Sequence, residues 1–197
     1  MADFRAFAAV SEAVLALLRS NYDPVDFNNE LDFRVFMARD FGSPTLQNGV
    51  SLFLYRVLPN GTYRAPAGRL DDNGRRYRNQ LAVDMHFVLT AWGGSASLQH
   101  TVAGWMMRIM EDSPLLPAGL LNSVLPDVFQ PDEAVEVMLA DLSTEDLLHV
   151  WETLVQNTYQ LSIPYVARNI RIESRLLQAA GQPVQQRTFE VAKHNGS

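Results

Sequence analysis

The chain has 197 residues, of which 47% are hydrophobic and 19% are charged, a balance typical of one folded domain with a buried core. It contains no cysteine, which excludes disulfides, thiolate metal sites and a cysteine nucleophile. The formal net charge of −6 disfavours nucleic-acid binding. The first residues lack the pattern of a signal peptide, and no apolar run is long enough for a membrane span, so we expect a cytoplasmic protein that contacts no membrane.

The first half of the chain predicts one helix, two strands and a long loop. Residues 3–20 carry apolar side chains at helical spacing, with Asp3 as the expected N-cap. Residues 31–35 alternate between polar and apolar, which predicts a half-buried strand. Residues 49–57 are nearly continuously apolar and predict a central strand covered on both faces. Glycine, proline and arginine dominate 60–79, which predicts a long exposed loop or flexible hairpin.

The second half predicts an alternation of strands and helices. Its elements are a strand at 81–90, a helix at about 97–112, a strand at 134–140, a helix to about Gln156 and a strand at 159–173. Ser143-x-x-Asp146 resembles a capping box and marks the start of the last helix. Pro164 favours an edge position or a bulge for the last strand. The order predicts an α+β fold with a single mixed sheet and about three packing helices.

The composition changes near the C-terminal end of the sequence. We expect a domain at 1–175 and a tail or arm at 176–197, because 179–183 reads as a linker and 184–192 favours an extended chain. We expect a partner to order this tail, and an extended tail is suited to adding a strand to a partner's sheet. The strand that contains Pro164 is the expected open edge for such a contact.

Charge is segregated along the sequence. Arginines gather between 56 and 78, whereas 109–167 contains no Lys or Arg and ten Asp or Glu residues. One interpretation is that these loops only carry solvating charge. The other is that a basic patch on one copy meets an acidic patch on the next, as a head-to-tail ring requires.

The sequence offers no motif for catalysis or for a cofactor. The histidines are scattered, and Asp84 with His86 or Glu145 with His149 lack a third metal ligand nearby in sequence. No serine lies in a Gly-x-Ser-x-Gly elbow, and no phosphate-binding loop is present. We therefore expect no catalytic, metal or cofactor-binding residues. A small hydrolase whose site assembles only in space remains an alternative.

Several segments, taken in order, resemble one known family. They are Val50–Val57, Arg78–Asp84, Leu89–Gly93, Gly104–Asp112 followed by Pro114 and Leu116-Pro117, Leu142–Leu147, Trp151, and Tyr159–Tyr165. Together they cover roughly 5–175 and resemble the cap, or tube-terminator, family of contractile injection systems. These are phage-tail-like machines such as the Photorhabdus virulence cassette and the antifeeding prophage.

The resemblance implies a structural subunit with a fold like that of phage tail-terminator proteins. It implies a homo-oligomeric ring, expected to be six-fold, at the baseplate-distal end of the inner tube. The ring is expected to end tube growth and to anchor the last layer of the sheath, within a particle assembled in the cytoplasm and able to be released. Some relatives carry a longer C-terminal extension, and we expect its role either to be absent here or to be taken over by the short tail that follows the domain.

The residues expected at the interfaces come from the arginine-rich segment and from the tail. We expect the 60–78 loop to face the tube or the ring lumen and the tail to reach the sheath. A neck or tail-completion protein of a contractile phage tail, and a monomeric adaptor or immunity-like module, are alternatives. The candidate interface residues are Arg64, Arg69, Arg75, Arg76, Arg78, Gln185, Thr188, Phe189 and Val191.

Overall fold

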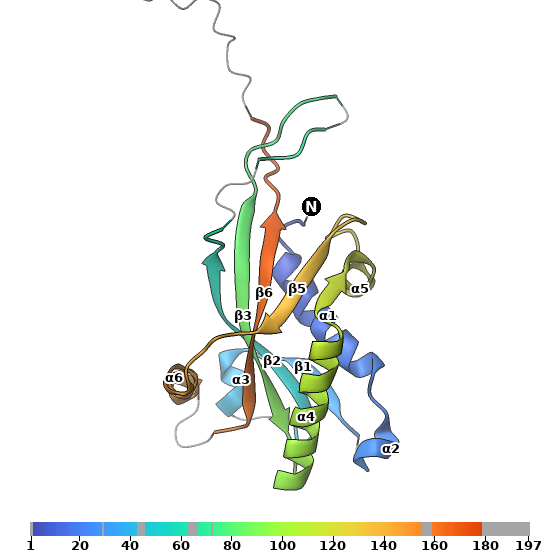
Figure 1. The fold of residues 1–197 in the computed structure, drawn as a ribbon, viewed down its shortest axis with the longest axis vertical. Coiled ribbons are helices and arrows are strands. Elements are labelled where there is room, and N and C mark those ends of the chain that lie inside the picture. The colour runs from blue at the N-terminus through green and yellow to red at the C-terminus, as the bar shows by residue number, and fades with distance from the viewer. Residues whose placement is uncertain are drawn as a thin grey trace, which may run out of the picture.

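One six-stranded mixed sheet organises the molecule. The structure is a computed structural model that describes residues 2–28, 30–42, 46–62, 67–71, 73–154 and 159–178. The elements are α1 (Ala6–Ser20), α2 (Pro24–Phe27), β1 (Asp32–Val35), α3 (Ala38–Gly42), β2 (Gly49–Pro59), β3 (Leu81–Trp92), α4 (Ala96–Asp112), β4 (Leu115–Pro117), α5 (Ala118–Val124), β5 (Ala134–Leu139), α6 (Thr144–Leu154) and β6 (Ser162–Ile172). The strand order is β1-β2-β3-β6-β5-β4, in which only β1 and β2 are parallel (Figure 1). The predicted α+β class and mixed sheet are confirmed.

The main core lies between one face of the sheet and the helices α1, α4 and α5. Every second residue of β3 points into it, and Met85, Phe87 and Leu89 are fully buried. Val14 and Leu18 of α1 are buried against this face. Fully burying side chains of this size contributes roughly 1.5–3 kcal/mol each. The amphipathic spacing seen in the sequence therefore identifies the helix that closes the core.

A second, smaller core covers the lower half of the opposite face, where α3 and α6 pack (Figure 1). Phe41 of α3 lies at its centre, with ring centroids 5.2 Å from Phe36, 5.2 Å from Trp151 and 5.3 Å from Phe53. Most of these contacts are edge-to-face, the arrangement that aromatic rings favour. This aromatic cluster holds both helices on the sheet.

Buried hydroxyl groups lie beneath the two tryptophans of this cluster. The indole N–H of Trp92 donates to Ser51 Oγ at 2.8 Å, and that of Trp151 donates to Ser162 Oγ at 3.2 Å. Thr90 Oγ1 lies 2.8 Å from Ser162 Oγ. Because a buried donor without a partner is costly, these hydroxyls allow tryptophan to be buried here.

Pro164 does not lie on an edge strand. β6 pairs with β3 on one side and with β5 on the other, so the sequence-based expectation of an open edge there is wrong. Pro164 instead lies where the β5 ladder ends, and its carbonyl accepts the last bond from Ala140 N at 3.0 Å. The missing N–H falls beyond the paired region, which makes proline acceptable inside a central strand.

The irregular part of β6 lies further along, at Arg168 and Asn169. Two residues there face the single residue Asp84 of β3, which makes a β-bulge. Asn169 has a φ of 55°, and its N–H donates to Asp84 Oδ1 at 2.8 Å. The side-chain amide of Asn60 donates to the same oxygen at 2.8 Å. Asp84 therefore fixes the bulge and the end of β2.

β2 is only half covered, in contrast to the prediction of a strand buried on both faces. Residues 49–52 are buried, whereas exposure increases from Phe53 to Pro59. β1 pairs with Gly49–Leu52 alone and then turns away into α3. The apolar residues in the second half of β2 are therefore not fully covered by the rest of the described chain.

The helix predictions were correct for the long helices and incomplete for the short ones. The three predicted helices correspond to α1, α4 and α6, and Ser143 Oγ accepts from Asp146 N at 3.0 Å as the capping box requires. The helices α2, α3 and α5 were not predicted because each has at most seven residues, too few to show periodicity. Asp3 is not the N-cap of α1, because it caps a turn by accepting from Arg5 N at 2.7 Å.

Candidate assembly surfaces

An ordered hairpin, here called the arginine hairpin, is formed by the described residues between 67 and 78. Leu70 pairs with Arg76, and the carboxylate of Asp71 accepts from the backbone N–H of Asn73 at 3.0 Å and of Arg75 at 2.7 Å. Arg75 Nε also donates to Asp71 Oδ2 at 2.8 Å. Asp71 therefore fixes the tip of the hairpin.

The tip should loosen when Asp71 loses its charge or its oxygens. The pKa of Asp71 is lowered, mainly because the backbone N–H of Arg75 donates to the carboxylate, and the Arg75 side chain lowers it further. A lowered carboxyl pKa stabilises the hairpin above about pH 4, and this contribution is lost as the pH falls through the lowered value. We expect Asp71→Ala to speed amide exchange at Asn73 and Arg75 on the order of tenfold, measured by NMR. Unchanged exchange would contradict this role.

The arginine hairpin is attached to the segment that follows β6. Tyr77 pairs with Leu177, and Arg78 N donates to the Leu176 carbonyl at 2.8 Å. A Cβ placed on Gly68 would lie 2.1 Å from the Tyr77 carbonyl oxygen, so the two sides of the hairpin approach as closely as glycine alone allows. The base of the hairpin is therefore tied to the body of the protein.

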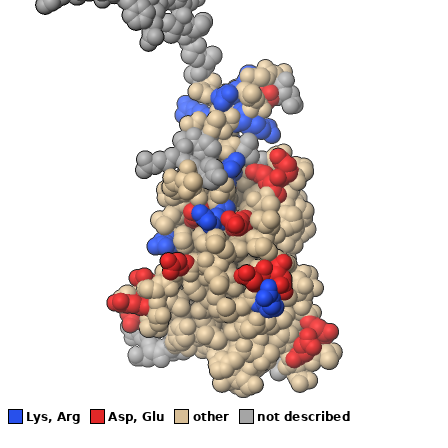
Figure 2. All heavy atoms as spheres, viewed as in Figure 1, with Lys and Arg blue, Asp and Glu red and all other residues tan. Residues whose placement is uncertain are grey.

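The hairpin gathers exposed positive charge at one end of the molecule, as Figure 2 shows in blue. Arg75 is neutralised by Asp71, and Arg69 lies 3.8 Å from Glu173. Arg76 and Arg78 are exposed and form no ion pair with any residue that the structure describes. Of the other candidate interface residues, Arg64, Gln185, Thr188, Phe189 and Val191 lie outside the described residues.

Most of the acidic residues visible in Figure 2 lie on the body of the molecule, where they are mixed with some basic residues. Asp112 pairs with Arg108, and Glu145 and Glu152 flank His149. The carboxylates that are exposed in the segment free of Lys and Arg are Glu111, Asp112, Asp127, Asp132, Glu136, Asp141, Glu145, Asp146 and Glu152. The exposed carboxylates of this segment therefore lie on the body, whereas the hairpin end is mainly positive.

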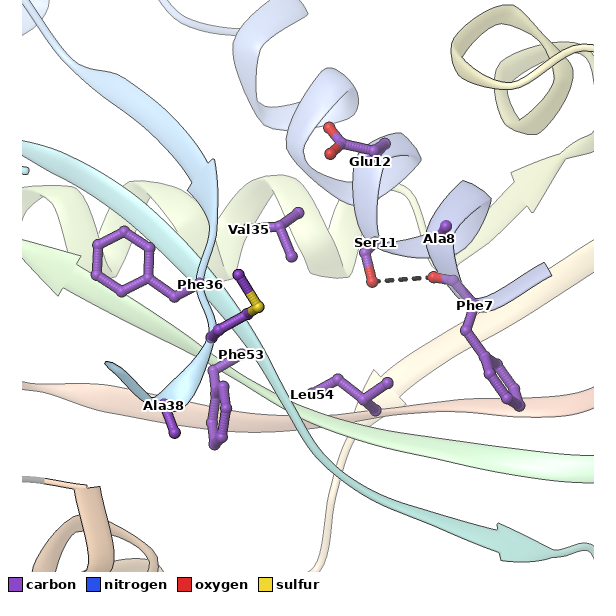
Figure 3. A pocket seen from close by; sticks show the side chains of 10 residues that line it. Phe7, Ala8, Ser11, Glu12, Val35, Phe36, Ala38, Phe53 and Leu54 are labelled. Carbon is purple, nitrogen blue, oxygen red and sulfur yellow. Dashed lines mark hydrogen bonds between the residues drawn. The ribbon is translucent and has the colours of Figure 1, made fainter. Parts of the chain in front are cut away.

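A groove of about 410 Å³ lies between α1 and β2, at the point where β1 turns away (Figure 3). Its lining is mostly apolar and comes from α1, from the end of β1, from the residues that lead into α3, and from β2. Ser11 Oγ donates to the Phe7 carbonyl at 2.9 Å, so the one hydroxyl in the lining is already bonded to its own helix. The lining residues are Phe7, Ala8, Ser11, Glu12, Val35, Phe36, Met37, Ala38, Phe53 and Leu54.

Asp84 and His86, considered above as metal ligands, make contacts within the fold. Asp84 is bonded to Asn60 and Asn169, while His86 lies beside Tyr55 with ring centroids 6.2 Å apart. His86 Nδ1 and Tyr55 Oη are buried without a hydrogen-bond partner among the described residues. Within the same part of the chain, three or more His, Asp or Glu residues do not converge anywhere on a metal-sized site.

The burial of His86 should make stability sensitive to mild acid. Its pKa is lowered, first by desolvation and then by Arg56, with Asp84 opposing. The unfolded chain therefore takes up a proton near pH 6.5 and the folded protein only below that value, so stability falls as the pH decreases through 6.5. We expect His86→Phe to lose less stability than the natural chain between pH 7 and pH 5, measured by urea unfolding. An equal loss would contradict this prediction.

The comparisons with known proteins decide the family. The family model of the Pvc16 N-terminal domain matches residues 9–186. The chain belongs to this family. A search of curated proteins finds no match.

None of the described helices is long and apolar enough to cross a membrane.

Two solved structures share the fold of this family member. One is the sheath/tube terminator of PVC, an extracellular contractile injection system, in its extended state, with a TM-score of 0.63 and 18% identity over 95% of this chain and 63% of that chain. The other is the tube-terminating cap of the anti-feeding prophage, with a TM-score of 0.58 and 16% identity over 92% of this chain and 60% of that chain. This chain therefore spans about three fifths of the length of either protein.

Proposed function

We propose that the chain is a structural subunit of the cap that ends the inner tube of a contractile injection system. The family match across 9–186 carries this proposal, and the likeness of the whole described fold to two terminating proteins supports it. The cap subunit contacts copies of itself, the inner tube protein and the sheath protein. It forms a six-fold ring, has no catalytic role, and is assembled in the cytoplasm as part of a particle that can be released.

The charge distribution supports contact between neighbouring copies. Arg76 and Arg78 are exposed and pair with no described carboxylate, and the exposed carboxylates of the body offer the opposite sign. Two different surfaces that complement each other give a head-to-tail contact, which closes into a ring when the rotation is right. The same charges steer the copies into register.

Salt should weaken this contact. The Debye length falls from about 10 Å at 0.1 M to about 3 Å at 1 M salt, so surface attraction between copies is largely lost. We expect the mass measured by light scattering to decrease as salt increases, and Arg76→Glu with Arg78→Glu to reproduce the decrease at low salt. Arg39→Glu is the matched control, because Arg39 is an exposed arginine outside the hairpin. An oligomer that is unaffected by both changes would remove the arginine hairpin from the interface.

The alternatives make different demands on the molecule. A neck or tail-completion protein would need a partner on the head side of a phage tail, whereas the two structures with this fold are terminators of phage-tail-like tubes. A hydrolase would need convergent polar groups, whereas the groove between α1 and β2 is lined mostly by apolar side chains and its serine is bonded to Phe7. Both observations favour the cap.

Tube growth in the presence of the purified chain tests the proposal. Inner tube protein is allowed to polymerise with increasing amounts of the chain, and tube length is measured by electron microscopy. A cap predicts shorter tubes as its amount increases, because each capped end stops adding subunits. The double variant Arg76→Glu and Arg78→Glu serves as the comparison for ring formation. Tube lengths that do not depend on the chain would contradict the proposal.

A further inference from the structure

The second half of β2 has an open edge. β1 pairs with β2 only from Gly49 to Leu52, and the last bond on that side runs from Phe36 N to the Leu52 carbonyl at 2.8 Å. β2 continues to Pro59, and among the described residues no strand pairs with this part on the side away from β3. An edge of this kind presents unpaired N–H and C=O groups to any extended chain that approaches.

The groove between α1 and β2 lies beside the start of this open edge. Figure 3 shows Val35 at the end of β1, Phe7 and Ser11 on α1, and Leu54 on β2 arranged around the space that β1 leaves. An extended segment that continued the sheet here would bond to β2 through its backbone. Every second side chain of that segment would enter the groove, which is how strand addition gains specificity.

The sequence contains a segment that matches the groove. Residues 188–191 read Thr-Phe-Glu-Val, so Phe189 and Val191 share one side of an extended chain and the polar residues share the other. Arg187 lies on the same side as Phe189, about 6.5 Å along the strand. Glu12 lines the groove, is exposed and pairs with no described cation, so it offers a partner for Arg187.

The length of the chain favours the groove of a neighbouring copy over the groove of the same copy. The tail leaves the described chain near Leu177, which pairs with Tyr77. The groove lies near Leu54, which pairs with Phe87. Tyr77 and Phe87 are ten residues apart, so the start of the tail lies about 33 Å from the groove along the strand direction. Crossing from β6 past β2 adds about 14 Å sideways. Phe189 lies eleven positions after Gln178, and eleven residue steps span at most about 40 Å. The two displacements are perpendicular and combine to about 36 Å, so this length leaves only about one residue, too few for the chain to reverse its direction.

We propose that residues 184–191 of one copy add a strand to the open edge of β2 in the next copy, with Phe189 and Val191 in its groove. This contact rests on the proposed function only in requiring copies to lie side by side. It differs from the expectation drawn from the sequence, which placed the tail on the sheath. The free edge lies at β2 and not at the strand that contains Pro164.

Engineered cysteines test the contact directly, because the natural chain has none. Copies that carry Ala8→Cys are mixed with ¹⁵N-labelled copies that carry Phe189→Cys, and oxidised; disulfide-linked peptides are identified by mass spectrometry. We expect the Ala8–Phe189 pair between labelled and unlabelled copies to dominate. Ser20→Cys replaces Ala8→Cys in the control, since Ser20 is exposed on α1 but lies about 18 Å further along the helix. Equal linkage to either position would overturn the proposal.

A chain carrying both Ala8→Cys and Phe189→Cys shows whether the tail that fills the groove belongs to the same copy or to a neighbouring copy. Linked dimers and higher species on a non-reducing gel support the exchange between copies. A monomer linked only within itself would overturn the proposal. These results do not depend on capping: tubes that are shortened normally by a chain without the linkage would leave the proposed function intact and remove this contact.

The charge pair gives an independent test of the register. We expect Glu12→Arg to weaken self-association roughly fivefold, the upper range for a partly exposed ion pair, and a second change, Arg187→Glu, to restore it. Deleting 179–197 should weaken self-association by at least as much as Glu12→Arg does, with the contact of the arginine hairpin remaining, whereas a tail that only bound the sheath would leave it unchanged. Association of unchanged strength after the deletion would overturn the proposal.

Discussion

Gly49→Ala is expected to lower the free energy of unfolding by about 3 kcal/mol or more, since it combines a strained backbone with a clash. Gly49 has a φ of +139°, a conformation that residues with a side chain rarely adopt. A Cβ at this position would lie 1.9 Å from the Asp32 carbonyl oxygen. The clash pushes β1 away from β2 at the first paired residue. Urea unfolding followed by tryptophan fluorescence measures the loss.

Gly104→Ala is the matched control for this change. Gly104 lies in the middle of α4, where an added Cβ would meet no atom within 4 Å. Alanine loses less entropy than glycine in a helix, so this variant should gain about 0.5–1 kcal/mol. A Gly49→Ala variant as stable as Gly104→Ala would show that β1 does not need its close approach to β2.

Phe41→Ala is expected to cost about 3–5 kcal/mol, the range for removing a buried aromatic side chain. Phe41 is 3% exposed and contacts Phe36, Phe53, Trp92 and Trp151. Its removal should release α3 and α6 from the sheet, because this cluster is the contact that holds them. The near-ultraviolet circular dichroism of the tryptophans should weaken more than the far-ultraviolet signal, because the main core on the other face is untouched.

Two control variants test whether the loss at Phe41 comes from its buried volume. Phe41→Leu keeps most of the volume and should lose less than Phe41→Ala, within about 1.5 kcal/mol of the natural chain if the site repacks. Phe4→Ala removes a phenylalanine that is 64% exposed and should have little effect. If Phe4→Ala destabilised the protein as much as Phe41→Ala, the second core would not be the anchor of these helices.

The fold was predictable wherever periodicity extended over enough residues. The long helices and all strands except β4 follow from their apolar patterns, since these patterns reflect burial against a sheet. β4 has three residues and α3 has five, so neither leaves a periodic signal. The function of α3 is visible only in space, where Phe41 meets Trp92 and Trp151 from distant parts of the chain.

The error at Pro164 has an informative physical cause. Proline was expected to mark an edge because it cannot donate to a ladder. In the structure, the hydrogen-bonded ladder between β5 and β6 ends at this residue. A central strand therefore accommodates the proline without leaving a carbonyl of β5 that needs its missing N–H. The point at which pairing ends depends on the length of the neighbouring strand, so the residues around the proline do not reveal it.

The candidate assembly surfaces were predicted in part. The arginine-rich segment stood out in the sequence, and Arg76 and Arg78 are indeed exposed and without a described carboxylate partner. The role of Asp71 was missed, although Asp at the first position of a turn before Asn-Gly is a known way to fix a tip. The groove between α1 and β2 was also missed, because Phe7, Val35 and Leu54 converge only after folding.

The position of the chain on an assembled particle tests the central claim most directly. Particles are produced with a gold-binding tag on the chain and examined by electron microscopy, with the baseplate marking one end. The cap predicts label at the end opposite the baseplate, on particles of uniform length. Label along the sheath, label at the baseplate, or unlabelled particles of normal length would contradict it.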